Sequence, residues 1–179
     1  MPEDIARREI NRLANLTPHP TITTSCFTLN EWDPLKGAVD LDEPEELMAR
    51  SLLLGILHRA IGEYEGSNSF LTETLAGRDK LSSSNWIVST TLFELATLDL
   101  VQAEARWPTR IGDTETKEQQ PIDAKVKEEW KKVLATATLR LDEASRLVSD
   151  SSSSLSNRVE SRAGMLRDEM GYKKAELGI

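Results

Sequence analysis

Few residues in this sequence have the types and spacing that enzyme chemistry requires. The 179 residues include two histidines, His19 and His58, and one cysteine, Cys26. His19 lies between two prolines and His58 lies inside an apolar helical pattern, and neither has Asp, Ser or Cys partners at a recognisable catalytic spacing. We therefore predict that the protein is not an enzyme and that His58 is a packing or groove residue.

Paired acidic residues supply carboxylates but not the remaining ligands of a metal site. Glu128-Glu129 and Asp142-Glu143 lie in a helical pattern, and carboxylate sites of helical bundles pair a glutamate with a histidine three residues later. Neither pair has that histidine, so we expect both on a solvated helix face. The nine glycines form no phosphate-binding motif after a strand. The sequence predicts no metal and no other cofactor.

Charge and hydropathy exclude further classes of function. The chain has 22 Lys+Arg against 30 Asp+Glu, a net charge of −8, which opposes binding to nucleic-acid phosphates or anionic lipids. The longest apolar run, Leu52–Leu57, is far shorter than the roughly 20 residues that span a bilayer, so no membrane span is expected. A single cysteine permits no internal disulfide and suits a reducing compartment.

The elements that hold these residues are predicted to be helices. From about residue 45 onward, apolar residues recur at spacings of three and four, which is typical of one helix face, and the fold class is therefore all-α. We expect tetratricopeptide-like antiparallel hairpins at about 45–77, 85–107 and 122–176, with a polar loop over 108–121. Together they form a helical-repeat domain over 45–179.

Residues 1–44 are predicted to be a separate capping segment. Residues 3–14 read as a short helix, whereas prolines and a glycine punctuate the Thr-rich stretch that follows, so no regular element is expected there. Trp32 in this irregular part is a candidate partner-binding residue, because exposed tryptophans are frequent at interfaces. An open terminal repeat would otherwise favour a homo-oligomer.

The first hairpin has most of the tetratricopeptide-repeat spacing. Gly55 would allow close approach of the second helix, and Gly62 would allow a left-handed turn. Ser67 and Thr74 stand where alanine is usual, and His58 stands where an aromatic residue is usual. The matching positions are Leu54, Gly55, His58, Gly62, Tyr64, Ser67, Leu71 and Thr74.

Longer motifs carry a resemblance to one family. These are Leu53–Arg59, Gly62–Glu65, Leu92–Ala96, Leu139–Ala144 and Leu155–Arg162. Through them the segment Glu45–Ala175 resembles the C-terminal part of the tetratricopeptide repeat protein 39 family, which includes fungal inclusion-body clearance proteins of the mitochondrial outer membrane. Members of that family are much longer than this chain. The resemblance implies an adaptor without chemistry of its own, acting in clearance of misfolded-protein inclusions at mitochondria or lipid droplets.

Repeat geometry also predicts where a partner would bind. It places Ala49, Leu52, Ile56, Arg59 and Ala60 on an inner groove, and we select Leu52, Ile56 and Arg59 as protein-binding residues together with Trp32. The groove lacks the Lys and Asn clamp for chaperone carboxylates, so chaperone tails are not expected there.

The sequence thus favours a non-enzymatic protein-interaction adaptor or scaffold. The compartments that remain open are the cytoplasm, the cytosolic face of the mitochondrial outer membrane through peripheral association, and the nucleus. A structural, self-associating helical bundle is the first alternative function, and a small helical enzyme is the second. The identity of the partner and the role of the serine runs stay undetermined.

Overall fold

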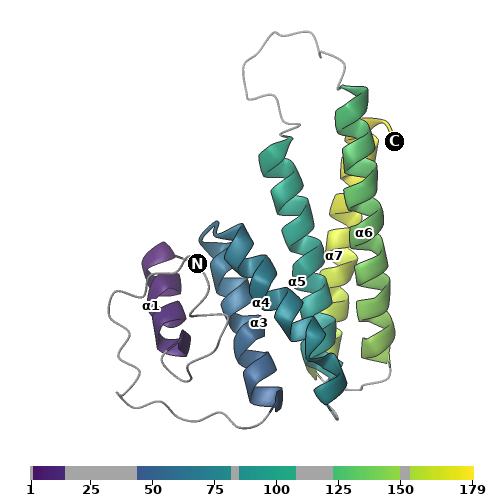
Figure 1. Cartoon of the computed structure of the whole chain (residues 1–179). Coiled ribbons are helices and arrows are strands. Elements are labelled where there is room, and N and C mark those ends of the chain that lie inside the picture. Colours follow the sequence, from purple (N-terminus) through teal and green to yellow (C-terminus); the bar gives the residue numbers. More distant parts are fainter. Residues whose placement is uncertain (1, 15–43, 82–84, 108–122, 150–153) are drawn as a thin grey trace.

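The computed structural model describes residues 2–14, 44–81, 85–107, 123–149 and 154–179 (Figure 1). Within these ranges every regular element is helical and no strand occurs, so the predicted all-α fold is confirmed. Trp32, most of the predicted irregular segment and the predicted loop 108–121 lie outside the described residues. The described elements are α1 (Glu3–Ala14), α3 (Pro44–Ala60), α4 (Tyr64–Ala76), the 3-10 turn η1 (Arg78–Lys80), α5 (Asn85–Arg106), α6 (Ala124–Ser149) and α7 (Ser154–Leu177).

Helices α3 and α4 form the predicted antiparallel hairpin. Gly62 in the turn has φ = 80°, a left-handed conformation that favours glycine. A Cβ atom on Gly55 would lie 2.7 Å from Cδ2 of Leu71, so the absence of a side chain lets α4 approach α3 closely. Both steric roles predicted for these glycines are confirmed.

Helix α1 covers the outer face of this hairpin. It confirms the short helix predicted over residues 3–14, and Figure 1 shows it beside α3. Its apolar residues pack in one cluster with residues of α3 and α4, which removes that face of the hairpin from water. The fully buried members of the cluster are Ala6, Ile10, Leu13, Ala14, Leu54, Leu57 and Phe70.

Helices α5, α6 and α7 form a three-helix bundle beside the hairpin. Figure 1 shows that each runs antiparallel to the one before it, which agrees with the hairpin predicted over 122–176. Residues 85–107 do not form a hairpin of their own, because Asn85–Arg106 contains no glycine or proline and continues as the single helix α5. The centre of the bundle is filled by Ala96, Ala103, Trp130, Leu134, Ala137, Leu141, Ala163, Leu166 and Met170.

Acidic residues of α6 lie at its surface. Glu128 and Glu129 lie on an outer face of α6 and pair with Lys131 and Lys132 at 3.7 and 2.8 Å. The prediction of a solvated helix face for these acidic residues is confirmed. None of the described helices is both long and apolar enough to cross a bilayer.

Candidate functional site

Of the residues predicted to line a groove on α3, Leu52 is buried by other helices, Ala49, Ile56 and Arg59 are half-buried, and Ala60 is exposed. Leu52 is 2 % exposed and belongs to a core cluster with Leu71 of α4 and Ile87 of α5, and Ile56 packs against the same cluster. The prediction that Leu52 lines an open groove is therefore wrong, because α4 and α5 cover this face of α3. Trp32 lies outside the described residues.

Arg59, the third predicted binding residue of α3, is engaged in an internal ion pair. Its Nη2 donates to Oε2 of Glu94 on α5 over 2.5 Å. The other oxygen of Glu94 accepts from Nη2 of Arg162 on α7 over 3.1 Å, and the Arg162 guanidinium lies 4.4 Å from the centre of the Phe93 ring. Glu94 is only 1 % exposed, so one buried carboxylate connects three helices.

Sequence reasoning missed Glu94, although a signal was present. Glu94 lies between apolar residues on both sides in Leu92–Ala96. A charged residue in the middle of an apolar run marks a buried group that needs a partner, since an unpaired buried charge is costly.

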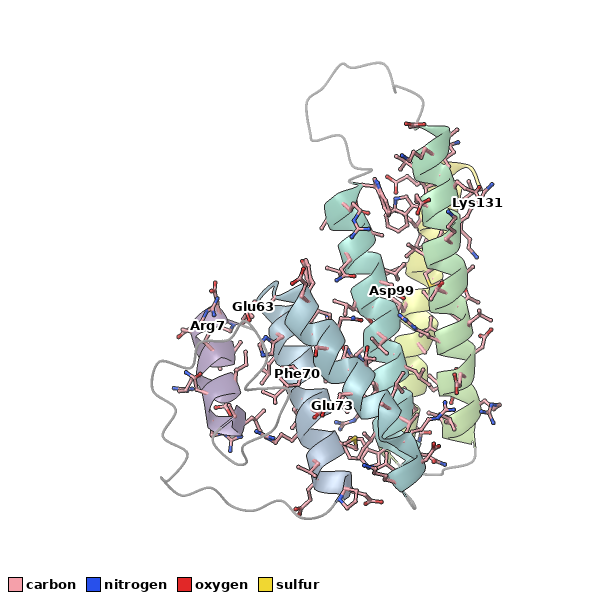
Figure 2. All side chains as sticks on the ribbon, in the orientation of Figure 1. Arg7, Glu63, Phe70, Glu73, Asp99 and Lys131 are labelled. Atoms are coloured by element: carbon pink, nitrogen blue, oxygen red, sulfur yellow. The ribbon has the colours of Figure 1, made fainter. Side chains whose placement is uncertain are left out.

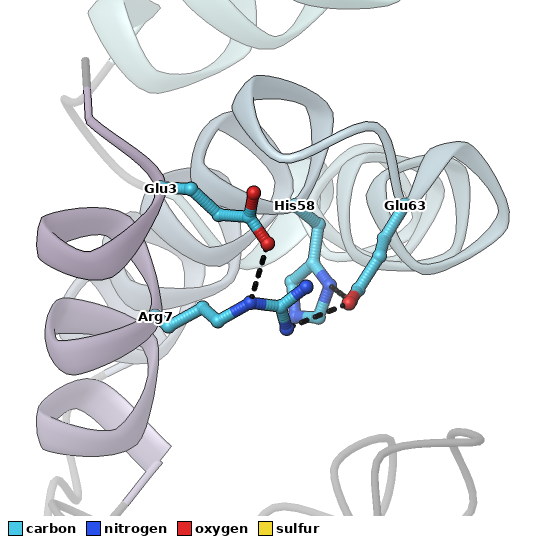
Figure 3. A network of polar contacts seen from close by, with 4 residues as sticks. All are labelled: Glu3, Arg7, His58 and Glu63. Atoms are coloured by element: carbon cyan, nitrogen blue, oxygen red, sulfur yellow. Dashed lines mark hydrogen bonds and ion pairs between the residues drawn. The ribbon is translucent and has the colours of Figure 1, made fainter.

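His58 takes part in a second polar network, at the turn between α3 and α4 (Figure 3). Its Nδ1 lies 2.9 Å from Oε2 of Glu63, whose other oxygen accepts from Nη1 of Arg7 over 3.1 Å. Arg7 Nε also donates to Glu3 over 2.9 Å, so the network joins α1 to the hairpin. The ring centre of His58 lies 5.1 Å from that of Phe70.

Burial decides the charge state of His58. The side chain is 2 % exposed, and burial lowers the pKa of the imidazole, with the nearby Glu63 carboxylate acting in the opposite direction. A neutral ring packed this deeply cannot be reached by a substrate in this conformation. Of the two roles predicted for His58, packing residue or groove residue, its burial agrees with packing.

A third polar contact closes the end of α1. Arg50 of α3 is 3 % exposed and donates from Nε to the carbonyl of Leu13 over 2.7 Å, and from Nη2 to that of Ala14 over 3.2 Å. The last carbonyls of a helix have no partner within that helix, and they attract positive charge. Burial lowers the pKa of Arg50 to about 10, which still leaves the guanidinium charged at neutral pH.

Asp99 of α5 and Arg140 of α6 form a fourth contact, which joins these two helices. Figure 2 shows Asp99 on α5, where its carboxylate accepts a hydrogen bond from Nη1 of Arg140. The same nitrogen donates to the carbonyl of Leu95 over 3.2 Å. Burial raises the pKa of Asp99, and Arg140 counteracts that shift. In these four contacts, polar or charged side chains of the described helices that are buried or half-buried pair with groups on neighbouring elements, and so hold the helices together.

An open groove lies on the other side of α5, between α5 and α7. Its volume is about 710 Å³, and α6 contributes Trp130 to its floor. We call it the α5–α7 groove and define it by its lining. The α5 wall is Thr97, Leu100, Val101 and Glu104; the α7 side contributes Leu166, Glu169, Met170, Tyr172, Lys173 and Glu176.

The floor of the α5–α7 groove is apolar and its rim is acidic. Among the described lining residues the cation is Lys173, whose Nζ lies 2.6 Å from Glu104, 3.1 Å from Glu176 and 4.9 Å from the centre of the Trp130 ring. Tyr172 is 78 % exposed beside them. The described lining thus has three glutamates and one lysine, and Glu169 is exposed.

Sequence reasoning did not predict this groove. The apolar stripe of α5 includes Leu100, but the adjacent Val101 widens that stripe beyond one face, and this was the signal for a second contact surface. Within the described residues, no group of three His, Cys, Asp or Glu side chains is placed to hold a metal ion.

Comparison with known proteins adds no relative. The chain matches no protein-family model, no curated protein and no solved structure. The resemblance to the tetratricopeptide repeat protein 39 family therefore stays a prediction.

Proposed function

We propose that the protein is a non-enzymatic protein-interaction adaptor that binds its partner in the α5–α7 groove. One observation carries this proposal: apolar side chains of α5, including Leu100 and Val101, line an open groove whose floor contains Trp130 and Met170. Trp130 and Met170 are 1 % and 4 % exposed, so the accessible aliphatic surface of the groove comes from the half-buried Leu100 and Val101 on its α5 wall. Apolar surface rimmed by polar residues is typical of interaction sites.

The shape of the groove favours a macromolecular partner. Its α7 side extends from Leu166 to Glu176, which at 1.5 Å per residue corresponds to roughly 15 Å of helix. An open surface of this length matches a segment of polypeptide. Following the family resemblance, we place this adaptor in clearance of misfolded-protein inclusions, in the cytoplasm or nucleus or on the cytosolic face of the mitochondrial outer membrane.

Site-specific crosslinking tests the proposal. A photoreactive amino acid is introduced at Val101 in the groove and, as a control, at Leu139, which is 71 % exposed on α6 and does not line the groove. After irradiation in cell lysate, we expect a partner protein crosslinked from position 101 and not from position 139. Equal crosslinking from both positions would contradict the proposal.

The same experiment separates the adaptor from its alternative. Crosslinks from position 101 to a second copy of the chain, with no other protein captured, would favour a self-associating structural bundle. If the protein is an adaptor, position 101 crosslinks to a different protein, and adding an excess of that protein without a label reduces the crosslink.

A further inference from the structure

We infer that the occupant of the α5–α7 groove is an amphipathic helix with basic residues, which completes a four-helix bundle with α5, α6 and α7. This inference rests on the proposed function and specifies the chemistry of the partner. Three features of the groove carry it: the spacing of its walls, its apolar floor and the charge of its rim.

Both walls of the groove repeat at helical spacing. Thr97, Val101 and Glu104 on α5 are separated by four and three residues, and Glu169, Tyr172 and Glu176 on α7 by three and four. Residues three and four apart lie on one side of a helix, so each wall is a continuous row of side chains. Two such rows with a space between them accept the ridge of another helix.

The floor specifies an apolar stripe on the guest helix. Trp130, Leu166 and Met170 lie beneath the groove, and Leu100 and Val101 of α5 flank it without full burial. Trp130, Leu166 and Met170 are at most 7 % exposed, so a guest with apolar residues at positions i, i+3 or i+4, and i+7 would cover mainly the half-buried Leu100 and Val101. Tyr172 stands exposed at the edge, where an aromatic ring packs readily against such a guest.

The rim specifies positive charge on the guest. Glu104 and Glu176 share Lys173, and Glu169 adds a further exposed carboxylate on the same wall, in a chain whose net charge is −8. Lys or Arg residues beside the apolar stripe would pair with the exposed Glu169 carboxylate and be attracted by the negative charge of the chain, whereas an acidic helix would be repelled. The charge therefore selects between guests of equal hydrophobicity.

Designed peptides test the inference on the full chain. The probe is a fluorescein-labelled amphipathic helix of about 18 residues, with leucines at heptad spacing and lysines beside them. A matched acidic peptide carries glutamates in place of the lysines, and a third peptide keeps the lysines but replaces leucine by serine. Fluorescence anisotropy gives the dissociation constant of each.

We expect the basic amphipathic peptide to bind at least about tenfold more tightly than either of the other two peptides. Its affinity should fall as salt rises, because the carboxylates of the rim are exposed to solvent. Equal binding of the basic and acidic peptides would overturn the inference, and so would full binding by the peptide without leucines.

Charge reversal in the groove provides the matched variants. The double substitution Glu169→Lys and Glu176→Lys should weaken the basic peptide by about tenfold and strengthen the acidic one. Glu160→Lys makes one such charge reversal at an exposed site of α7 that does not line the groove, and should leave both affinities within about twofold, whereas Glu169→Lys alone should already weaken the basic peptide. A Glu160→Lys effect as large as the double reversal would show nonspecific attraction and overturn the inference. Circular dichroism confirms that each variant is helical before it is used.

Failure of this inference is distinguishable from failure of the proposed function. If a lysate protein crosslinks at Val101 through an acidic or extended segment, the proposed adaptor function still holds, but the inference that the guest is a basic helix is overturned. A crosslink mapped to a basic amphipathic helix supports both. Sedimentation that shows a dimer whose formation the basic peptide cannot displace would assign the groove to a second copy and overturn the inference.

Discussion

Arg59 of α3 and Glu94 of α5 form an ion pair in which Nη2 and Oε2 lie 2.5 Å apart. Arg162 of α7 binds the other oxygen of the same carboxylate. Glu94 therefore connects the hairpin of α3 and α4 to the last helix of the bundle. A carboxylate in this position contributes to specificity as well as to stability, since each arginine must find the same partner.

Removing the Glu94 side chain should be costly. Glu94→Ala leaves two guanidinium groups without their buried partner, and we expect a loss of about 2–4 kcal/mol in the free energy of unfolding, reduced from the fully buried case because Arg162 is half exposed. Urea denaturation followed by circular dichroism measures this loss. Glu160→Ala on the exposed face of α7 is the control and should change stability by less than about 0.5 kcal/mol. Equal losses in the two variants would argue against the connecting role of Glu94.

Protonation of His58 should destabilise the fold. Burial lowers the pKa of this imidazole below its ordinary value of 6.5, so between the two values the unfolded chain binds more protons than the folded one. Stability is then fully present above pH 6.5 and decreases as the pH falls toward the pKa of the folded state. Urea midpoints measured between pH 8 and pH 5 report this decrease, and His58→Gln should remove most of it.

Glu63 should set the lower limit of that pH window. Its carboxylate raises the pKa of His58 against the effect of burial. Glu63→Gln should therefore lower the pKa further, and the loss of stability should continue to lower pH than in the parent chain. A variant whose pH dependence coincided with that of the parent would mean that Glu63 does not act on the ring.

Arg50 should hold α1 on the hairpin. Arg50→Met keeps an unbranched side chain but removes the hydrogen bonds to the carbonyls of Leu13 and Ala14. We expect a loss of about 1–3 kcal/mol, concentrated in α1, because the freed carbonyls lose charge-assisted partners. Hydrogen exchange of the α1 amides measures the effect. Arg8→Met on the exposed side of α1 should leave their exchange unchanged, and faster exchange in that control alone would refute the assignment.

Two glycines in helices should respond in opposite directions to alanine. At Gly55 a new Cβ would lie 2.7 Å from Leu71, so Gly55→Ala should destabilise the hairpin by about 1–3 kcal/mol. At Gly164 on α7 nothing lies within 4 Å of the added atom, so Gly164→Ala should stabilise by about 0.5–1 kcal/mol. Thermal unfolding midpoints compare the two variants. Shifts of the same sign would contradict the close helix contact at Gly55.

The helices themselves could be predicted because the spacing of their apolar residues shows which face of each helix is buried. On α6, the stripe of Trp130, Leu134, Ala137 and Leu141 reads as one face in the sequence, and each of these residues is at most 1 % exposed. The role of Gly62 at the α3–α4 turn followed in the same way, since a left-handed φ is a local property. Local patterns were sufficient wherever the structure depends on residues a few positions apart.

The candidate site could not be predicted in this way. An apolar stripe such as that of Leu52 looks the same whether another helix covers it or a groove leaves it open, and only the packing of α4 and α5 decides between them. The α5–α7 groove depends on the separation of Val101 from Tyr172, two residues 71 positions apart in the chain. No local spacing encodes that separation.

Two-dimensional ¹⁵N–¹H spectra of the full chain, titrated with the basic amphipathic peptide, test the central claim most directly. The indole N–H of Trp130, below the groove, and the backbone amides of residues 97–104 and 166–176 should show the largest shifts. The indole of Trp86, which packs in the cluster between α3 and α5, should stay in place. Shifts centred on α1 and α3, or an unchanged Trp130 signal at saturating peptide, would contradict a helix-binding groove between α5 and α7.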